Sequence, residues 1–400
     1  MTAFSINPDI IPWACEYLNL TLAEFARAIH VSEHVMEGWK NGEKKPSLIQ
    51  ARKMADKLLI PLGYLVLKKM PRITLDAVDF RTVGNQHVSN PSLELWATYN
   101  MALSRHEWYK DCAIENEYEP CRCVGSITPK TPVKEAADAI RATLGAVEQS
   151  PNGRKTWENR FNGLVNAIED KAGIMVMRNS MVGNNSHKPL SVEEFRGFAI
   201  SDEYAPLIFI NSKDSKNAQL FTLLHELVHV FLGRGGISGQ DYLNGSENAV
   251  ERYCNQVAAE YLVPAEELLQ KWQEDGDGGE KNLDDKIKRL ASEHQVSAMV
   301  MIIRCQSLGL IDRQQASDLW QKEIKAIQIQ KSSRQGMGKP YAVIANRVSR
   351  LFARSIIWQL ETMRIQPDDA FRLLNVKNDK AMRQLAKEVG VFYPRLRRSA

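Results

Sequence analysis

Residues 221–233, which read FTLLHELVHVFLG, contain two histidines four positions apart and a glutamate directly after the first. In a helix, His225 and His229 project from the same face one turn apart, so both imidazoles can reach one tetrahedral metal ion. Glu226 lies to one side of that position, where its carboxylate can act as a general base for a water molecule. The stretch therefore predicts two zinc ligands with an adjacent base.

The alternative is a buried structural helix that happens to carry two imidazoles. Most other positions in the stretch are leucine, valine or phenylalanine, which indicates that one side of the helix lies in the core. Two unpaired histidines and a glutamate inside so apolar a helix would be costly to desolvate, and a metal at a cleft removes that cost. The zinc interpretation is favoured for this reason.

A third ligand is expected downstream, because a catalytic zinc takes three protein ligands and keeps one position open. In SENAVERYCNQVAAEYLVP, Glu251 and Asn255 are four positions apart on one face of the next predicted helix. Glu251 would complete a His₂Glu site, and Asn255 could orient a ligand histidine. Glu247 is a competing third ligand, and Glu260 is a weaker candidate.

The strand-like run PLIFIN, residues 206–211, lies just before the histidine-containing helix. We expect it to be an edge strand that pairs with an extended substrate segment, because main-chain pairing is a common way to grip peptides. The expected chemistry is hydrolysis, with Glu226 taking the proton of a water molecule and delivering it to the leaving amine.

The N-terminal region reads as short helices. Thr21 with Glu24 three residues later predicts a capping box, and Ser32 predicts the start of a second helix after a very short break. Residues 71–90 have no clear period and are predicted to be an irregular connection. The order along the chain is a helical N-terminus, a mixed centre and a helical C-terminus, which indicates an α+β, mostly helical fold.

Composition favours a globular protein with several domains. The chain has 400 residues, a net charge of +4, 44% hydrophobic and 25% charged residues. We find no signal peptide and no run long enough to span a bilayer, so the expected location is the cytoplasm, without membrane contact. Six scattered cysteines do not suggest a disulfide framework, and the adjacent pair Cys121 and Cys123 lacks the second pair that a zinc finger needs.

Two blocks of the sequence resemble known families. The segments EFRGFAI, PLIFINSKDS, FTLLHELVHVFLG and VERYCNQVAAEYLVP closely resemble the ImmA/IrrE family of metallopeptidases. The segment GWKNGEKKPS resembles Xre-type, lambda-repressor-like helix-turn-helix domains, and the combination is similar to regulators that fuse the two. The resemblance covers residues 7–85 and 190–265 well. It implies a gluzincin-like zinc endopeptidase with a small sheet, in which His225, His229 and Glu251 hold Zn²⁺ and Glu226 is the catalytic glutamate.

The resemblance also implies a DNA-binding face on the second helix of the N-terminal pair, which would lie in the major groove. The candidate contacts are Ser32, Glu33, His34, Glu37, Lys40, Asn41, Lys44 and Lys45. Glu33 and Glu37 depart from the family pattern, because they put negative charge on a face that should approach phosphates. The alternative is a helix-turn-helix that is kept as a protein-binding module.

The expected domains are, in order, an Xre-type helix-turn-helix domain (1–75), a helical connector (76–125), a zinc metallopeptidase domain (126–275), a helical extension (276–335) and a C-terminal helical region (336–400). The expected function is a DNA-binding transcriptional regulator with a zinc-dependent endopeptidase domain that cleaves a repressor or partner protein in a stress, phage or mobile-element response. The alternative is an antitoxin that neutralises a toxin by binding it and represses its own operon. The expected partners are promoter or operator DNA and a protein. A homodimer would suit such domains, which usually read two half-sites.

Overall fold

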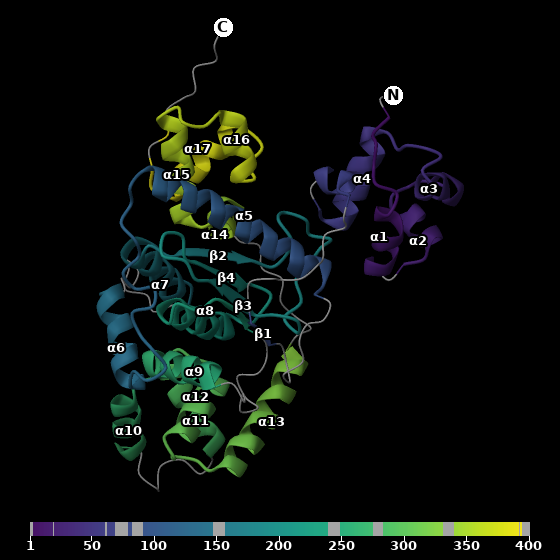
Figure 1. The fold of residues 1–400 in the computed structure, drawn as a ribbon. Coiled ribbons are helices and arrows are strands. Elements are labelled where there is room, and N and C mark those ends of the chain that lie inside the picture. Colours follow the sequence, from purple (N-terminus) through teal and green to yellow (C-terminus); the bar gives the residue numbers. More distant parts are fainter. Residues whose placement is uncertain are drawn as a thin grey trace. The chain divides into compact units, whose positions relative to one another are not determined.

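A computed structural model describes residues 3–18, 20–60, 62–68, 79–81, 91–146, 157–238, 249–274, 283–330, 340–391 and 393. The chain divides into two compact units. The first unit is Met1–Asp76 with Ser89–Asn100, and the second is Ala77–Val88 with Met101–Ala400. Figure 1 shows the elements of both units.

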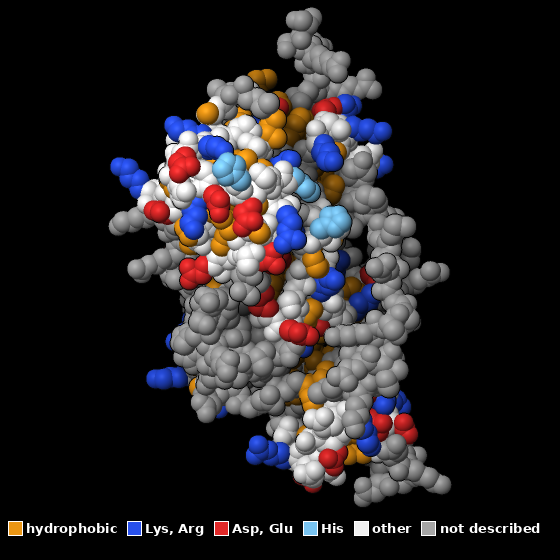
Figure 2. Space-filling view, turned by 90° about the vertical axis from the view of Figure 1, so that its right-hand side faces the viewer, with side chains coloured by type: hydrophobic (Ala, Val, Ile, Leu, Met, Phe, Trp, Pro, Cys, Tyr) orange, Lys and Arg blue, Asp and Glu red, His pale blue; other side chains and the backbone are white. Residues whose placement is uncertain are grey.

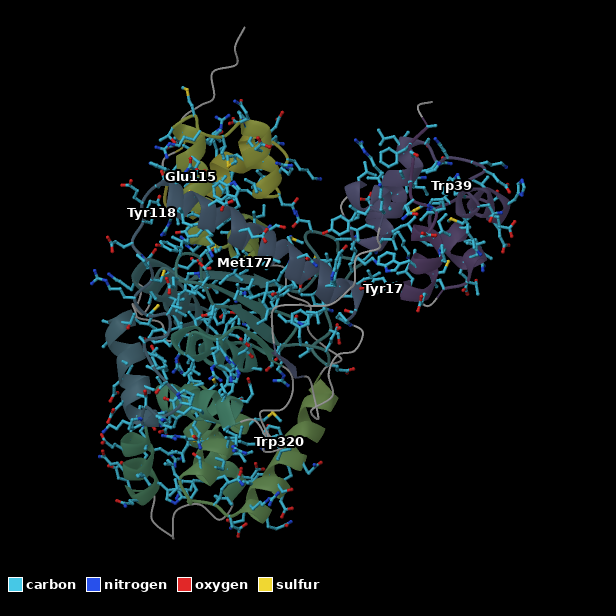
Figure 3. All side chains as sticks on the ribbon, in the orientation of Figure 1. Tyr17, Trp39, Glu115, Tyr118, Met177 and Trp320 are labelled. Atoms are coloured by element: carbon cyan, nitrogen blue, oxygen red, sulfur yellow. The ribbon has the colours of Figure 1, made fainter. Side chains whose placement is uncertain are left out.

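The first unit is helical. Its elements are α1 (Ile10–Leu18), α2 (Leu22–Ala28), α3 (Glu33–Lys40), α4 (Leu48–Leu58), the 3₁₀ helix η1 (Leu62–Val66) and the beginning of α5 (Leu93–Glu115). The predicted capping box is confirmed: the Thr21 side chain accepts from the Glu24 backbone N–H, and the Glu24 carboxylate accepts from that of Thr21. Ser32 caps α3 as predicted, so α2 and α3 are separated by four residues only. Trp39, labelled in Figure 3, is buried and anchors α3 in the core of this unit.

The second unit is built on a five-stranded sheet with the order β1-β5-β3-β4-β2. The strands are β1 (Asp79–Arg81), β2 (Met175–Asn179), β3 (Gly197–Ile200), β4 (Leu207–Asn211) and β5 (Gly236–Ser238). Strand β3 runs antiparallel to β4 and β5, whereas β2 is parallel to β4 and β1 is parallel to β5. Strand β1 falls inside the segment that the sequence predicted as irregular. Three residues are too few for a periodic signal, so its pairing with β5 was not predictable locally.

Helices cover both faces of this sheet. All five residues of β4 are buried, which explains why the first four, LIFI, form a continuous apolar run instead of an alternating one. On one face Phe198 stacks on Phe209 with ring centroids 4.9 Å apart, and on the other Ile208 and Ile210 join the core that includes α8. Figure 1 shows α8 on one side of the sheet and α14 on the other.

The helices of the second unit are, besides the rest of α5, α6 (Val133–Leu144), α7 (Trp157–Ala172), α8 (Lys216–Phe231), α9 (Ala249–Leu262), α10 (Ala265–Glu274), α11 (Leu283–Glu293), α12 (Ala298–Ser307), α13 (Arg313–Gln330), α14 (Pro340–Val348), α15 (Arg350–Glu361), α16 (Pro367–Leu373) and α17 (Asp379–Glu388). The structure is therefore mostly helical with one small sheet, as the α+β prediction states. Within the described part of the chain, no helix combines the length and the apolar character that crossing a membrane requires.

Candidate metal centre

Helix α8 carries the paired histidines. Ser215 caps its N-terminus by accepting from the Ala218 backbone N–H, and every residue from Gln219 to Phe231 is buried. The helix has features of both sequence alternatives: its leucines and valines pack in the core, while His225 and His229 converge with a third side chain in a group that could hold a metal. The two imidazole Nε2 atoms lie 3.0 Å apart.

The third side chain is Glu251, in the first turn of α9. Its two carboxylate oxygens lie 3.1 Å from His225 Nε2 and 3.2 Å from His229 Nε2. Zinc–ligand bonds of about 2.0–2.2 Å in a tetrahedral site place neighbouring ligand atoms roughly 3.3 Å apart, so these three donors fit the ion. Among the described residues, His225, His229 and Glu251 are the group of His, Cys, Asp and Glu side chains that could hold a metal.

The charge and tautomer states also suit a metal. Burial alone would raise the pKa of the Glu251 carboxyl, but hydrogen bonds from His225 and His229 hold that pKa well below its usual range, so the carboxylate is ionised. His225 Nδ1 lies 2.8 Å from Asn255 Oδ1. An amide oxygen accepts only, so Nδ1 of His225 carries a proton. A metal at the centre would replace the proton through which His225 Nε2 bonds Glu251 and would take the Nε2 lone pair. Asn255 occupies the orienting place that the sequence suggested for it.

Glu226 lies against β3. A Cβ atom placed on Gly197 would be 3.2 Å from Glu226 Oε1, 2.7 Å from Thr222 Cγ2 and 2.9 Å from the Phe209 carbonyl oxygen. Gly197 lacks a side chain at the point where β3 passes the buried carboxylate. Sequence reasoning missed this role; a glycine at a strand position close in sequence to a predicted site is the signal that could have revealed it.

Cys254 was also missed. It lies three residues after Glu251, is buried, and its thiol forms a side-chain hydrogen bond with His229. Burial raises the pKa of this thiol, so Cys254 remains neutral beside the imidazole. The sequence could have indicated Cys254, because it is adjacent to Asn255 on the helix that carries the candidate third ligand, Glu251.

The expected edge strand is not an edge. Strand β4 lies between β3 and β2, so both of its sides are paired. The strand nearest Glu226 is β3, and it too is paired on both sides, with Gly197 opposite Ile210 of β4 and Ser238 of β5. The error arose because strand order depends on pairing between distant segments, which the local pattern does not contain.

The weaker candidate ligand is engaged elsewhere. The Glu260 carboxylate forms a buried ion pair with Arg304, which ties α9 to α12. Glu247 lies outside the described residues. The Cys121 and Cys123 thiols donate to the backbone carbonyls of Gly173 and Ala172, at 3.6 and 3.7 Å.

The eight candidate DNA contacts lie in the first unit, on α3 and the residues that flank it, and all are exposed. The Ser32 hydroxyl is used to cap α3. The Lys44 side chain lies over α3. A Cβ atom placed on Gly38 would be 2.9 Å from Lys44 Cδ, and Lys44 Nζ lies 3.2 Å from His34 Nε2. Figure 2 shows acidic and basic side chains interspersed on the surface that it presents, without a continuous basic patch.

The comparisons with known proteins concern the second unit. No curated protein matches the chain. Residues 169–306 match the family model Peptidase_M78, described as the IrrE N-terminal-like domain. The matched span contains α8 and α9, and hence both histidines, Glu226 and Glu251. The match supports the ImmA/IrrE part of the resemblance and a peptidase-type domain at these residues.

Proposed function

We propose that the second unit is a zinc-dependent endopeptidase. The observation that carries this proposal is the convergence of His225, His229 and Glu251 at distances of 3.0–3.2 Å, with Glu226 following the first histidine. The match of residues 169–306 to a peptidase family model supports it independently.

When bound, a zinc ion would polarise the scissile carbonyl and make a water molecule more acidic. Glu226 would accept the proton of that water and pass it to the leaving amine. Asn255 would hold His225 in its ligand tautomer, and the neutral Cys254 thiol would hold His229 from the other side. Burial of Glu226 and both histidines keeps bulk water out of the reacting region, which strengthens each electrostatic interaction there.

The test is Glu226→Gln, an isosteric change that removes the base and keeps every ligand. We expect zinc content to stay near one ion per chain, while cleavage of denatured casein and of a mixed peptide library falls by about 10²–10⁴-fold. Glu203→Gln, at an exposed position, is the matched control and should retain activity. Equal turnover by the parent and Glu226→Gln would refute the proposal.

We further propose that the first unit is a helix-turn-helix DNA-binding module, which would make the whole chain a transcriptional regulator. The short α2–turn–α3 arrangement with an exposed face on α3 supports this. The test is a mobility-shift assay on the promoter of the chain's own gene, at several salt concentrations. An affinity for that promoter no greater than for random duplex of equal length would remove the DNA-binding function.

A second candidate function is that of an antitoxin-like binding protein, with promoter repression by the first unit and no need for turnover. The pairing of both sides of β3 favours it, because an extended substrate cannot add to that strand while β5 is in place. Cells that express Glu226→Gln distinguish the two. If this variant protects against a partner toxin and represses as the parent does, the function is binding. If it retains zinc but no longer protects or represses, the function is proteolysis.

A further inference from the structure

Three large apolar side chains are exposed where α5 and α15 end. The exposed fractions are 40% for Tyr118, 38% for Trp358 and 89% for Met363. We call these three residues the helix-end patch. Figure 3 labels Glu115 and Tyr118 at this end of α5.

Side-chain contacts hold the two helix ends against each other. The Gln359 amide donates to Cys112 Sγ at 3.0 Å, and the Arg364 guanidinium donates to Asn116 Oδ1. The same guanidinium lies over the Trp358 ring, 5.1 Å from its centroid. The indole is therefore held in place by a cation–π contact from a residue that is itself bonded to the neighbouring helix end.

The two helices end in the same way. The Tyr118 N–H bonds the Ala113 carbonyl, and the Arg364 N–H bonds the Gln359 carbonyl, each five residues back. The residues before them, Glu117 and Met363, have φ values of 54° and 56°. This left-handed position closes a helix and turns the chain away from it, and glycine usually occupies it. In α15 this position is Met363, whose side chain faces solvent.

Most charged side chains beside the patch are acidic. Glu115, Glu117 and Glu119 interleave with Tyr118, and Glu361 lies two residues before Met363; all four are exposed. The exception is Arg364, whose guanidinium is engaged by Asn116 and by the Trp358 ring. Both helix C-termini add the negative end of their dipoles at the same place. A rigid apolar centre with a negative rim complements a partner that carries apolar anchors flanked by lysine or arginine.

We propose that the helix-end patch is a docking site for a basic, amphipathic helical segment of another protein. The apolar anchors of that segment, at positions such as i, i+3 and i+4, would lie on Trp358 and Met363. Its lysines or arginines would face the four glutamates. The patch lies outside the metal centre, and this inference does not depend on peptidase activity.

The test uses the full chain with methionine methyl groups labelled with ¹³C. The probe is a 16-residue helical peptide of lysine and leucine in an amphipathic pattern, and its control has glutamate in place of lysine. We expect the lysine peptide to shift the Met363 methyl signal and to leave that of the buried Met301 unchanged. We expect its affinity to exceed that of the glutamate peptide by at least about tenfold, and to fall with added salt.

Variants locate the binding. Trp358→Ala with Met363→Ser should weaken lysine-peptide binding by about tenfold or more, because truncated apolar anchors carry most of such an interface. Leu269→Ser is the matched control, since Leu269 is 36% exposed on the acidic helix α10 but lies outside the patch. The proposal fails if the two peptides bind alike, or if the double variant binds as the parent does. Parent dimers in sedimentation that the double variant abolishes would also overturn it, because the occupant would then be a second copy.

Discussion

At the residue scale, Gly197 is a position whose role became clear from the structure. We predict that Gly197→Ala lowers peptidase turnover by roughly 10–100-fold and leaves zinc content unchanged. The added methyl would lie 2.7 Å from Thr222 Cγ2 and 3.2 Å from Glu226 Oε1, so the helix and the carboxylate must shift. Displacing a reacting group by about 1 Å can cost that much. Turnover on the peptide library and zinc per chain are the measurements.

Gly63→Ala is the matched control for this change, because a Cβ at Gly63 meets no atom within 4 Å. It should leave turnover as it is. If Gly197→Ala is as active as the parent, β3 does not set the position of Glu226. If it loses zinc as well, the effect is on the fold of the centre and not on the base.

Asn255 gives a prediction that concerns the metal and not the chemistry. Asn255→Ala removes the acceptor 2.8 Å from His225 Nδ1, so the imidazole can rotate and change tautomer. We expect zinc affinity, measured by competition with a chelator, to fall about 10–100-fold, as is usual when a partner behind a ligand is lost. Gln256→Ala, on the exposed side of the same helix, should change nothing. Unchanged affinity in Asn255→Ala would show that His225 needs no orienting partner.

At the element scale, helices were easier to predict than strands. The apolar period and the caps of α2 and α3 are local, and both helices begin where the sequence placed them. The histidine-containing stretch was also predicted to be helical, although no start or cap was assigned to α8. The three candidate ligands and Asn255 could be proposed because helical spacing puts His225 with His229, and Glu251 with Asn255, on common helix faces. Strand β1 and the interior position of β4 could not be predicted, because both depend on pairing between segments far apart in the chain.

Another contact between distant elements joins α7 to the start of α15. Glu169 Oε1 accepts from the Ser349 hydroxyl at 2.5 Å and from the Arg350 N–H at 3.0 Å, while its Oε2 is buried without a hydrogen bond. Burial raises the pKa of Glu169 to about 7, although these bonds oppose the shift. Its pKa in the unfolded chain is about 4.3. Between about pH 4.3 and pH 7, Glu169 is therefore protonated in the folded state and ionised in the unfolded state.

We predict from this that Glu169 makes stability fall as pH rises. Its stabilising contribution is complete below about pH 4 and is lost as pH rises through about 7, on the order of 3–4 kcal/mol in all. Glu169→Gln keeps an acceptor for Ser349 and cannot ionise, so it should be more stable than the parent at pH 8 and nearly equal to it at pH 5. Urea denaturation at the two values measures this. A difference between variant and parent that is the same at both pH values would contradict the assignment.

At the scale of the whole molecule, the first unit has little net charge for a DNA-binding module. Residues 3–68 and 91–100 contain eight lysines and arginines and eight aspartates and glutamates. Most DNA binding is driven by lysines and arginines that release counterions from the phosphates. In this unit, acidic side chains offset those cations. Repulsion should be strongest at Glu33 and Glu37, which are exposed on α3.

We therefore predict that changing both acids, Glu33→Gln with Glu37→Gln, strengthens binding to random duplex by about three- to tenfold at low salt. Lys45→Ala should weaken it and make the salt dependence less steep, by close to one unit of slope for one lost phosphate contact. Glu16→Gln, on the exposed side of α1, is the control for a general charge effect. Mobility shifts between 50 and 200 mM salt measure all three. If the Glu33 and Glu37 variant binds duplex no better than the parent, and Glu16→Gln behaves alike, then α3 does not face DNA. Its exposed face would then be available to a protein partner, as in the alternative reading of this unit.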